Sequence, residues 1–248
     1  MKVFLAIGSG ISKERQPYLY PLLSKSKYLL QSFYYIKKSE IQFIKNSEMF
    51  LLDSGAFTFL NSKKSNIDID NYLDRYIEFI NKHNVKYFFE MDTDIIHGLS
   101  KVEKMRYKLE QKTGKKCIPV WHKTRGINYY IDLCKTYNYI AVGGIAIKSI
   151  KPSQYTIFTK LLNIAKKYNC NVHGLGFTQT KLLNKYKFYS VDSTTWNSCF
   201  TYGNIYRFSN GFMQRYKFKN KRLANYTLGG VNNLKEWIKY QEFANYYL

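Results

Sequence analysis

Short apolar segments alternate with longer amphipathic segments along almost the whole 248-residue chain, and this alternation constrains the fold more than any other feature. The apolar segments have the length and the β-branched and aromatic composition of buried strands. We expect strands at residues 2–7, 49–52, 86–91, 117–121, 139–142, 171–175 and 188–191, with a weaker eighth at 204–208. Helices are expected at 69–82, 101–112, 127–137, 153–168, 179–185 and 234–247, and residues 27–38 are a further helical candidate.

Regular alternation of strand and helix predicts a parallel sheet, because each parallel strand pair needs a crossover connection. About eight strands in a chain of 248 residues match a closed (β/α)₈ barrel. No Gly-x-Gly-x-x-Gly motif follows the first strand, which disfavours a doubly wound nucleotide-binding sheet. The sequence has no internal repeat or interdomain linker. We therefore predict one α/β domain over residues 1–248, a TIM-type barrel.

The charge balance points to a polyanionic partner. The chain has 39 Lys and Arg against 17 Asp and Glu, a formal net charge of +22. Such an excess favours nucleic acid, whose neutralised phosphates release counterions. An AT-rich genome explains the preference for Lys over Arg but does not explain the shortage of acidic residues. An acidic membrane surface, or no special partner, are the alternatives.

Neither a targeting segment nor a metal-binding motif is recognisable. The apolar run at residues 3–7 is too short for a signal sequence or a membrane span, so we expect a cytoplasmic protein without membrane contact. The four cysteines form no Cys-x-x-Cys pair, and the four histidines lack zinc-ligand spacing. We expect reduced thiols, no metal and no other cofactor. The cysteines are Cys117, Cys134, Cys170 and Cys199.

Polar residues and glycines follow the predicted strands. In a parallel barrel the carboxyl ends of the strands meet at one rim, where the active sites of such barrels lie. Three carboxylates, two histidines and several glycines would therefore converge, and this indicates a functional site. The rim candidates are Asp53, Ser54, Asp92, His122, Gly143, Gly144, His173, Gly174 and Asp192.

Two of these carboxylates are candidates for catalysis. Asp192 is the only acidic residue from Leu133 through Lys235, whereas the same stretch has sixteen Lys and Arg. An electropositive rim would keep it ionised as a nucleophile or base, although it could instead cap the next helix. Asp53 follows the apolar run 49–52 and precedes a glycine turn. The alternative for Asp53 is an ordinary Asx turn at a strand exit.

The other rim residues are candidates for binding. Asp92 ends an apolar run and is the better ligand candidate, since Asp94 could instead cap the following helix. Gly143 and Gly144 would present bare backbone to a ligand, or form a bulge at a barrel corner. His173 is either a wall of a slot for a flat base or a hydrogen-bonded structural residue.

Basic and aromatic residues interleave in the segment 206–222. This pattern suits a surface that follows phosphates and stacks bases. The alternative is a strand with a buried aromatic face and a solvated basic face, and the two descriptions are compatible. The predicted nucleic-acid-binding residues are Arg207, Arg215, Lys217, Lys219, Lys221 and Arg222.

Five rim motifs, taken in order, resemble those of the tRNA-guanine transglycosylase superfamily. They read Asp-Ser-Gly-Ala-Phe at 53–57, Met-Asp-Thr at 91–93, Gly-Gly-Ile-Ala at 143–146, His-Gly-Leu-Gly at 173–176 and Val-Asp-Ser at 191–193. The resemblance covers roughly residues 50–195. It implies that Asp192 attacks the sugar C1′ and that Asp53 serves the departing and arriving bases as acid and base.

The resemblance also implies the roles of the binding residues. Asp92 would hold the guanine edge, Gly143 and Gly144 would offer backbone contacts, and Phe57 and His173 would sandwich the ring. We assign Ser54, His122 and Gly174 to the same substrate-binding rim. Two carboxylates flanking a glycosidic bond can cleave it with retention, and a base paired in a duplex must first be flipped out.

Departures from the family pattern refine the expectation. Trp121-His122 stands where the family has a base-reading Gln, Thr93 replaces a Glu, and His173 replaces a Met. The family's zinc motif, which supports tRNA binding, is absent, so we expect no zinc subdomain. The chain in this respect looks like phage and bacterial relatives that insert 7-deazaguanines into DNA.

We therefore expect exchange of guanine in DNA for a 7-deazaguanine co-substrate such as preQ0, in the host cytoplasm if the protein is phage-encoded. Three alternatives stay open at this point. The same exchange could act on tRNA, water could resolve the intermediate as in an N-glycosidase, or the protein could bind nucleic acid without catalysis.

Overall fold

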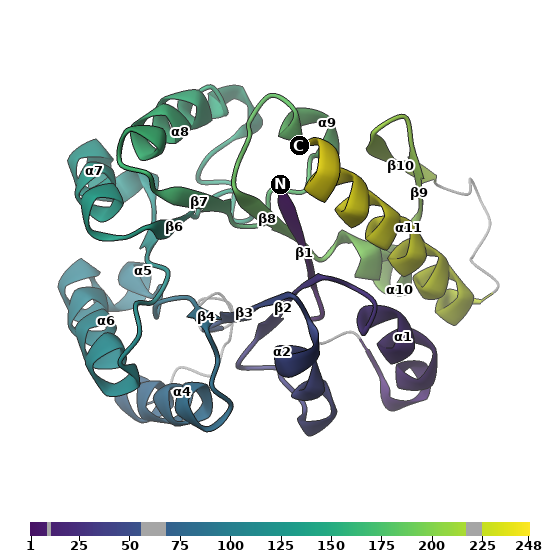
Figure 1. Cartoon of the computed structure of the whole chain (residues 1–248), viewed down its shortest axis with the longest axis horizontal. Helices are drawn as coiled ribbons and strands as arrows, with labels where there is room; N and C mark the ends of the chain where they lie inside the picture. Colours follow the sequence, from purple (N-terminus) through teal and green to yellow (C-terminus); the bar gives the residue numbers. More distant parts are fainter. Residues whose placement is uncertain (9–10, 56–67, 217–224) are drawn as a thin grey trace.

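The computed structural model describes residues 1–8, 11–55, 68–216 and 225–248. Eight parallel strands form one sheet in the order β4-β3-β2-β1-β8-β7-β6-β5, and the sheet curls into a barrel with helices outside it (Figure 1). The strands are β1 (Lys2–Ala6), β2 (Tyr28–Ser32), β3 (Met49–Asp53), β4 (Tyr87–Phe88), β5 (Val120–Trp121), β6 (Tyr139–Val142), β7 (Asn171–Gly174) and β8 (Ser190–Ser193).

The two edge strands of this sheet, β4 and β5, meet at a short seam. Phe89 and Ile118 form an isolated parallel bridge. The amide of Ile118 donates to the carbonyl of Phe88 at 2.8 Å, and the amide of Glu90 donates to the carbonyl of Ile118 at 3.1 Å. These contacts join the ends of the sheet. The prediction of a single-domain (β/α)₈ barrel is confirmed.

Helices form the outer layer of the barrel. The 3-10 turns are η1 (Lys13–Arg15), η2 (Lys38–Glu40), η3 (Lys123–Arg125), η4 (Pro152–Gln154) and η5 (Thr195–Asn197). The α-helices are α1 (Gln16–Leu23), α2 (Gln42–Asn46), α4 (Ile69–Lys82), α5 (Asp94–His97), α6 (Leu99–Thr113), α7 (Gly126–Thr136), α8 (Ile157–Lys167), α9 (Thr180–Leu183), α10 (Ser198–Tyr202) and α11 (Tyr226–Tyr247).

Helix α4 shows how the sequence specifies these elements. The side chain of Asp68 accepts hydrogen bonds from the amides of Asp70 and Asn71, which caps the first turn. Its apolar residues recur at helical spacing and bury one face against the sheet. The buried residues of α4 are Ile69, Tyr72, Leu73, Tyr76, Ile77 and Ile80.

Apolar side chains cover both faces of the sheet. Alternate residues of β1 show this arrangement: Val3 and Leu5 belong to the cluster under the helices, whereas Phe4 and Ala6 belong to a second cluster inside the barrel. Strands buried on both faces read as continuous apolar runs rather than alternating ones. This explains why the short apolar segments predicted strands so well.

Two expected elements are wrong in place or type. Residues 27–38 were the helical candidate, but they contain β2, whose residues Tyr28 to Gln31 are all buried. The 204–208 segment is a strand, β9 (Ile205–Ser209), but it pairs antiparallel with β10 (Phe212–Tyr216) in a hairpin outside the barrel. The hairpin lies beside α11 (Figure 1). The predicted number of eight barrel strands is still right, because β2, which was not predicted, is in the barrel and β9 is not.

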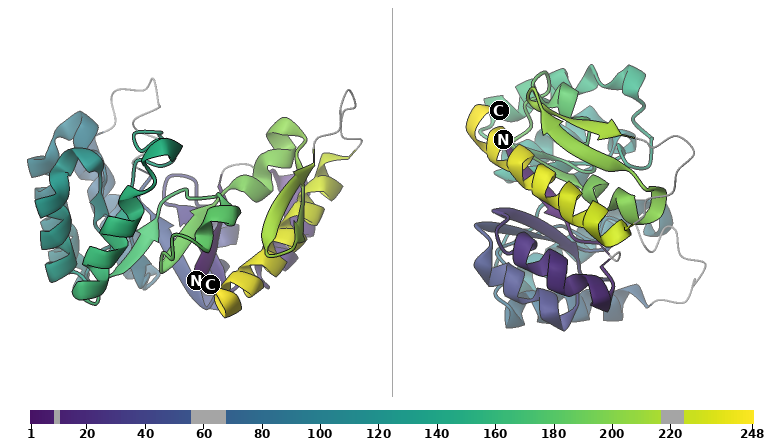
Figure 2. Two further views of the ribbon diagram at one scale, coloured as in Figure 1. Left: turned by 90° about the horizontal axis from the view of Figure 1, so that it is seen from above. Right: turned by 90° about the vertical axis from the view of Figure 1, so that its right-hand side faces the viewer.

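Both ends of the chain lie at one end of the barrel (Figure 2). The terminal ammonium group of Met1 donates to the carbonyl of Ala244 at 2.9 Å, which ties the start of β1 to α11. The carboxyl ends of the parallel strands therefore point to the opposite end of the barrel. Among the described residues, no helix combines the length and the apolar character needed to span a membrane.

Candidate functional site

A cavity of about 340 Å³ lies at the carboxyl ends of the strands. Every one of the eight strands, or the residues that follow it, contributes to the lining. Of the predicted site residues, the cavity is lined by Asp53, Ser54, Asp92, His122, Gly143, Gly144 and Asp192. Phe57, Lys217, Lys219, Lys221 and Arg222 lie outside the described residues.

Asp192 is held at the end of β8 by two donors on the same oxygen. Its Oδ1 accepts the amide of Gly176 at 2.6 Å and faces His173 Nε2 at 3.2 Å. Within the described part of the chain, no hydrogen bond to Oδ2 is found. The capping alternative does not apply, because the amide of Thr195 binds Ser193 Oγ at 3.1 Å instead. Asp192 is thus fixed through one oxygen, while no donor from the described residues binds the other.

Asp53 combines both of its predicted descriptions. Its Oδ2 accepts the amide of Gly55 at 3.0 Å, which is an Asx turn, and the residue also lines the cavity. Gly55 has φ +82°, and a Cβ there would lie 2.9 Å from Tyr34 Cβ, so glycine is required. Burial raises the pKa of Asp53 to about 6, and the negative charge of Asp192 adds to the increase. The two carboxylates therefore interact across the cavity.

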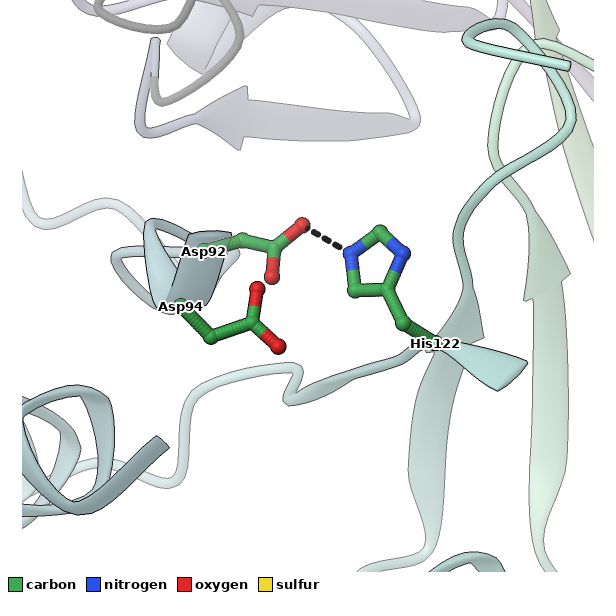
Figure 3. Close-up of side chains that lie close together, drawn as sticks. All are labelled: Asp92, Asp94 and His122. Carbon is green, nitrogen blue, oxygen red and sulfur yellow. Dashed lines mark hydrogen bonds and ion pairs between the residues drawn. The ribbon is translucent and has the colours of Figure 1, made fainter. Parts of the chain in front are cut away.

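Asp92, Asp94 and His122 form a cluster on the wall that follows β4 and β5 (Figure 3). His122 Nε2 lies 2.6 Å from Asp92 Oδ2. Arg125 donates to Asp92 Oδ1 at 2.8 Å and to Asp94 Oδ2 at 2.9 Å. The prediction that Asp94 caps the following helix is wrong, since Thr93 occupies the cap position and the Asp94 carboxylate binds Arg125.

Buried ion pairs behind this cluster were not among the predictions from the sequence. The Arg125 side chain is 1% exposed and also donates to Glu90 at 2.9 Å. Glu90 is fully buried and binds Arg106 at 3.2 Å. Burial favours the neutral form of Glu90 and raises its pKa, although both arginines oppose that increase. Arg125 lies three residues after His122, so its nearness to the rim was the one available signal.

His122 carries a shifted pKa. Burial disfavours its charged form, but the carboxylate of Asp92 outweighs burial and raises the pKa above the ordinary histidine value. The ring packs against Gly143, where a Cβ would lie 2.5 Å from His122 Cε1. Gly144 has φ +88° and is crowded by Ser149 Oγ. The two glycines are therefore needed by neighbouring side chains, and both also line the cavity.

Asp92, Asp94 and His122 also have the residue types of a metal site. One ligand atom each from Asp92, Asp94 and His122 lie within 4.8 Å of one another. Hard carboxylate oxygens with an imidazole suit several divalent cations. However, a cation would share both carboxylates with the guanidinium of Arg125, which already binds each of them. The arrangement therefore suits a hydrogen-bonding surface better than a cation site.

His173 does not form a wall of the cavity, so the prediction that it stacks on a base is wrong. The residue is fully buried, and its ring meets the rings of Phe4 and Phe89 at centroid distances of 5.9 and 5.3 Å. Its alternative, a hydrogen-bonded buried histidine, describes the geometry. Gly174 also lies away from the cavity lining, against Phe177 and other aromatic side chains.

The predicted strand with a buried aromatic face and a solvated basic face describes β9 but not β10. In β9, Tyr206 is buried and Phe208 packs on Tyr240 at 5.7 Å between ring centroids, whereas Arg207 lies on the opposite face and is exposed. In β10, Arg215 pairs with Tyr206 and so lies on the same face as Tyr206, although it is also exposed. Binding of nucleic acid by these two arginines stays a prediction.

Gln31 is a cavity residue that the sequence did not reveal, because β2 was not recognised as a strand. Its buried Oε1 accepts the amides of Gly8 at 3.1 Å and Ser32 at 2.9 Å. Its Nε2 donates to Glu40 at 2.8 Å. Gln31 therefore sits in a fixed orientation at the cavity.

No protein-family model matches the chain, and no curated protein sequence does. Solved structures share the fold. The carboxyl transferase domain of pyruvate carboxylase from Rhizobium etli has 10% identity and a TM-score of 0.50, over 98% of this chain and 48% of that chain. An enolase protein from Sargasso Sea environmental sequencing has 8% identity and a TM-score of 0.43, over 77% and 53%. A GH113 β-1,4-mannanase has 13% identity and a TM-score of 0.41, over 73% and 74%.

This chain spans about half the length of the first two of these structures, at 48% and 53%. The cavity of this chain lies at the carboxyl ends of the strands, the end at which TIM barrels carry their active sites. At identities of 8 to 13%, the similarity concerns the fold. The chain is an α/β protein of the TIM-barrel fold.

Proposed function

We propose that this protein exchanges guanine in DNA for a 7-deazaguanine base such as preQ0, through a covalent bond between Asp192 and the sugar. One observation carries the proposal: two carboxylates share a single cavity but stand in different environments. Asp53 has its pKa raised to about 6 by burial and by Asp192, whereas Asp192 accepts two hydrogen bonds on one oxygen. Environments that differ in this way assign separate roles to two carboxyl groups.

In the first half of the reaction, Asp192 Oδ2 attacks C1′ of the target nucleotide. The bond between C1′ and N9 of guanine breaks, and its electron pair leaves with the base. Protonated Asp53 gives its proton to the departing base, and an ester between Asp192 and the sugar is formed. A pKa of about 6 leaves part of Asp53 protonated near neutral pH.

In the second half, the incoming 7-deazaguanine attacks C1′ through its own N9. The N9 proton passes to the Asp53 carboxylate, and the bond between C1′ and Asp192 Oδ2 breaks. Its electron pair returns to the Asp192 carboxylate. Each turnover thus restores both carboxyl groups, and the two displacements together retain the configuration at C1′.

Asp92 and His122 supply the chemistry for reading the base. A carboxylate can accept the N1–H and the exocyclic amine of guanine, and a 7-deazaguanine offers the same edge. Arg125 and His122 orient the Asp92 carboxylate through bonds of 2.8 and 2.6 Å. One recognition surface therefore serves the departing and the arriving base in turn.

Charge and accessibility support a nucleic-acid substrate. The formal net charge is +22. Exposed Lys123 and Lys148 directly follow the cavity-lining residues His122 and Ile147, and would meet phosphates near the cavity. A base inside a duplex must leave the stack to enter a cavity of this kind. DNA is proposed over tRNA because the zinc motif associated with tRNA binding is absent.

The test is incubation of the purified protein with DNA and isotopically labelled preQ0, followed by mass spectrometry of the nucleosides. We expect labelled deoxynucleoside from the wild-type protein and none from Asp192→Asn or Asp53→Asn. Asp132→Asn, at an exposed position of α7, is the matched control and should retain activity. Without preQ0, denaturing gels should show a protein–DNA adduct that Asp192→Asn lacks.

Each other outcome points elsewhere. If a parallel incubation labels tRNA while DNA stays unlabelled, the substrate is tRNA and not DNA. Release of guanine without incorporation would make the protein an N-glycosidase. Full activity of Asp192→Asn would overturn the mechanism.

A further inference from the structure

A chain of three buried side chains runs through the barrel behind Asp192. Tyr139 Oη lies 2.6 Å from Ser190 Oγ, and Ser190 Oγ lies 2.7 Å from His173 Nδ1. His173 Nε2 then lies 3.2 Å from Asp192 Oδ1. Tyr139 lies on β6, His173 on β7 and Ser190 on β8, which are neighbours in the sheet. His173 and Ser190 are fully buried.

Only one arrangement of protons satisfies every group in this chain. Burial raises the pKa of Tyr139 far above its ordinary value, so the phenol keeps its proton and donates to Ser190 Oγ. Ser190 in turn donates to His173 Nδ1, and the imidazole carries its proton on Nε2, facing the Asp192 carboxylate. The opposite tautomer would set the lone pair of Nε2 against a carboxylate oxygen.

We infer that His173 is a positioning residue for the nucleophile: its Nε2–H holds Asp192 Oδ1, and the Tyr139–Ser190 pair fixes the tautomer that makes this possible. The inference rests on the proposed role of Asp192. The amide of Gly176 is the second donor to the same oxygen, at 2.6 Å. With Oδ1 fixed, the carboxylate cannot rotate freely, and Oδ2 is left to meet C1′.

The same two donors act in both halves of the reaction. In the covalent intermediate Oδ1 becomes the carbonyl oxygen of the ester, which still accepts both hydrogen bonds. When the bond between C1′ and Oδ2 breaks, negative charge returns to the carboxylate and the donors stabilise it. His173 does not line the cavity, so its loss should lower the rate without weakening the binding of DNA.

Two substitutions of His173 separate positioning from packing. Glutamine can place an amide N–H near the position of Nε2, so His173→Gln retains a donor to Asp192 and loses the contact with Ser190. Asparagine can place an oxygen near the position of Nδ1, so His173→Asn retains the acceptor for Ser190 and loses the donor to Asp192. Both variants lose the ring contacts with Phe4 and Phe89, and both should lower the thermal unfolding temperature similarly.

The first measurement is the single-turnover rate of adduct formation on DNA without preQ0. We expect His173→Asn to be slower than wild type by roughly 10- to 100-fold, the effect of losing a hydrogen bond to a charged group, at unchanged KM for DNA. His173→Gln should stay within about threefold of wild type. The inference would be overturned if the two variants formed the adduct at the same rate, whether that rate equals the wild-type rate or is lower.

The second measurement does not depend on activity. Nitrogen-15 chemical shifts of the His173 imidazole in the full chain should show a proton on Nε2 and an unprotonated Nδ1. Asp192→Ala should shift the Nε2–H resonance, whereas Asp132→Asn should not. A proton on Nδ1 alone would overturn the inference. If wild-type protein forms no adduct, the proposed function fails, and the imidazole spectrum still decides whether His173 holds Asp192.

Discussion

At the scale of single residues, Asp53 should set the pH dependence of the reaction. Burial and the charge of Asp192 raise its pKa to about 6, and the first half of the reaction uses its protonated form. The rate of adduct formation should therefore fall as pH rises through 6, approaching a tenfold loss per pH unit above it. Single-turnover rates between pH 5.5 and 8.5 measure this.

The matched variant is Asp53→Asn, which cannot donate or accept this proton. It should form the adduct slowly at every pH, with no loss of rate centred near pH 6. A wild-type rate that increases with pH across this range would show that Asp53 acts as a base in the first step.

Gly143 is the second residue whose role can be tested alone. A Cβ at this position would lie 2.5 Å from His122 Cε1, so Gly143→Ala should push the imidazole away from Asp92. Because Asp92 is what raises the pKa of His122 against burial, the variant should have a lower His122 pKa. Proton NMR titration of the histidines measures this.

The same variant separates base recognition from DNA binding. Guanine exchange should fall by roughly tenfold or more, since the Asp92 carboxylate loses one of its two orienting partners. Affinity for DNA should change little. An unchanged His122 pKa with reduced exchange would mean that Gly143 acts through the ligand and not through His122.

At the scale of elements, the sequence predicted most strands and helices but misjudged β2. Its residues Tyr28 to Gln31 are buried on both faces, so they show neither the alternation of a half-buried strand nor a clear helical period. Short runs of this kind fit either element. The strand at 205–209 was recognised, but its place in a separate hairpin depends on pairing with β10, which local sequence does not encode.

In the candidate site, too, the sequence predicted what depends on local position and missed what depends on contacts between distant segments. Strand-end positions identified Asp53, Asp92 and Asp192, because the carboxyl ends of parallel strands meet at one rim. The ion pair between Glu90 and Arg125 was missed because it joins segments 35 positions apart across the seam of the barrel. The orientation of His173 was missed because a strand-end position does not tell whether a side chain faces the cavity or the interior.

The buried ion pairs of Glu90 with Arg106 and Arg125 at this seam should contribute to the stability of the fold. Among the described residues, Arg125→Met would leave fully buried Glu90 with Arg106 as its one charged partner, beside the amide of Val120. Losing one partner of a buried pair typically costs about 3–5 kcal/mol, so the free energy of unfolding should fall by about this amount. Urea unfolding measures the change.

The double variant Glu90→Gln with Arg125→Met tests the cause. Removing both charges should recover a large part of the lost stability, although guanine exchange should stay low because Asp92 and Asp94 have lost Arg125. If the double variant is no more stable than Arg125→Met, the loss comes from packing of the arginine and not from the unpaired carboxylate.

At the scale of the whole molecule, net charge and the exposed arginines of the β9–β10 hairpin should govern affinity for DNA. With +22 formal charge and roughly five to eight phosphates engaged, log K should fall with log salt at a slope of about −4 to −7. Arg207 and Arg215 are both exposed on the hairpin, which packs on α11 through Phe208. Replacing both with glutamine should make the slope less steep by about 2 units, since each phosphate contact contributes about 0.9.

The control is Lys160→Gln at an exposed position of α8, which lies apart from the hairpin (Figure 1). It removes one positive charge and should change the slope by less than 1 unit. Fluorescence anisotropy with double-stranded DNA over a salt series measures both. Because the arginines act on binding and not on chemistry, the exchange rate of DNA that is already bound should be unchanged in the double variant. A slope equal to wild type would remove the hairpin from the DNA surface and direct attention to Lys123 and Lys148 beside the cavity.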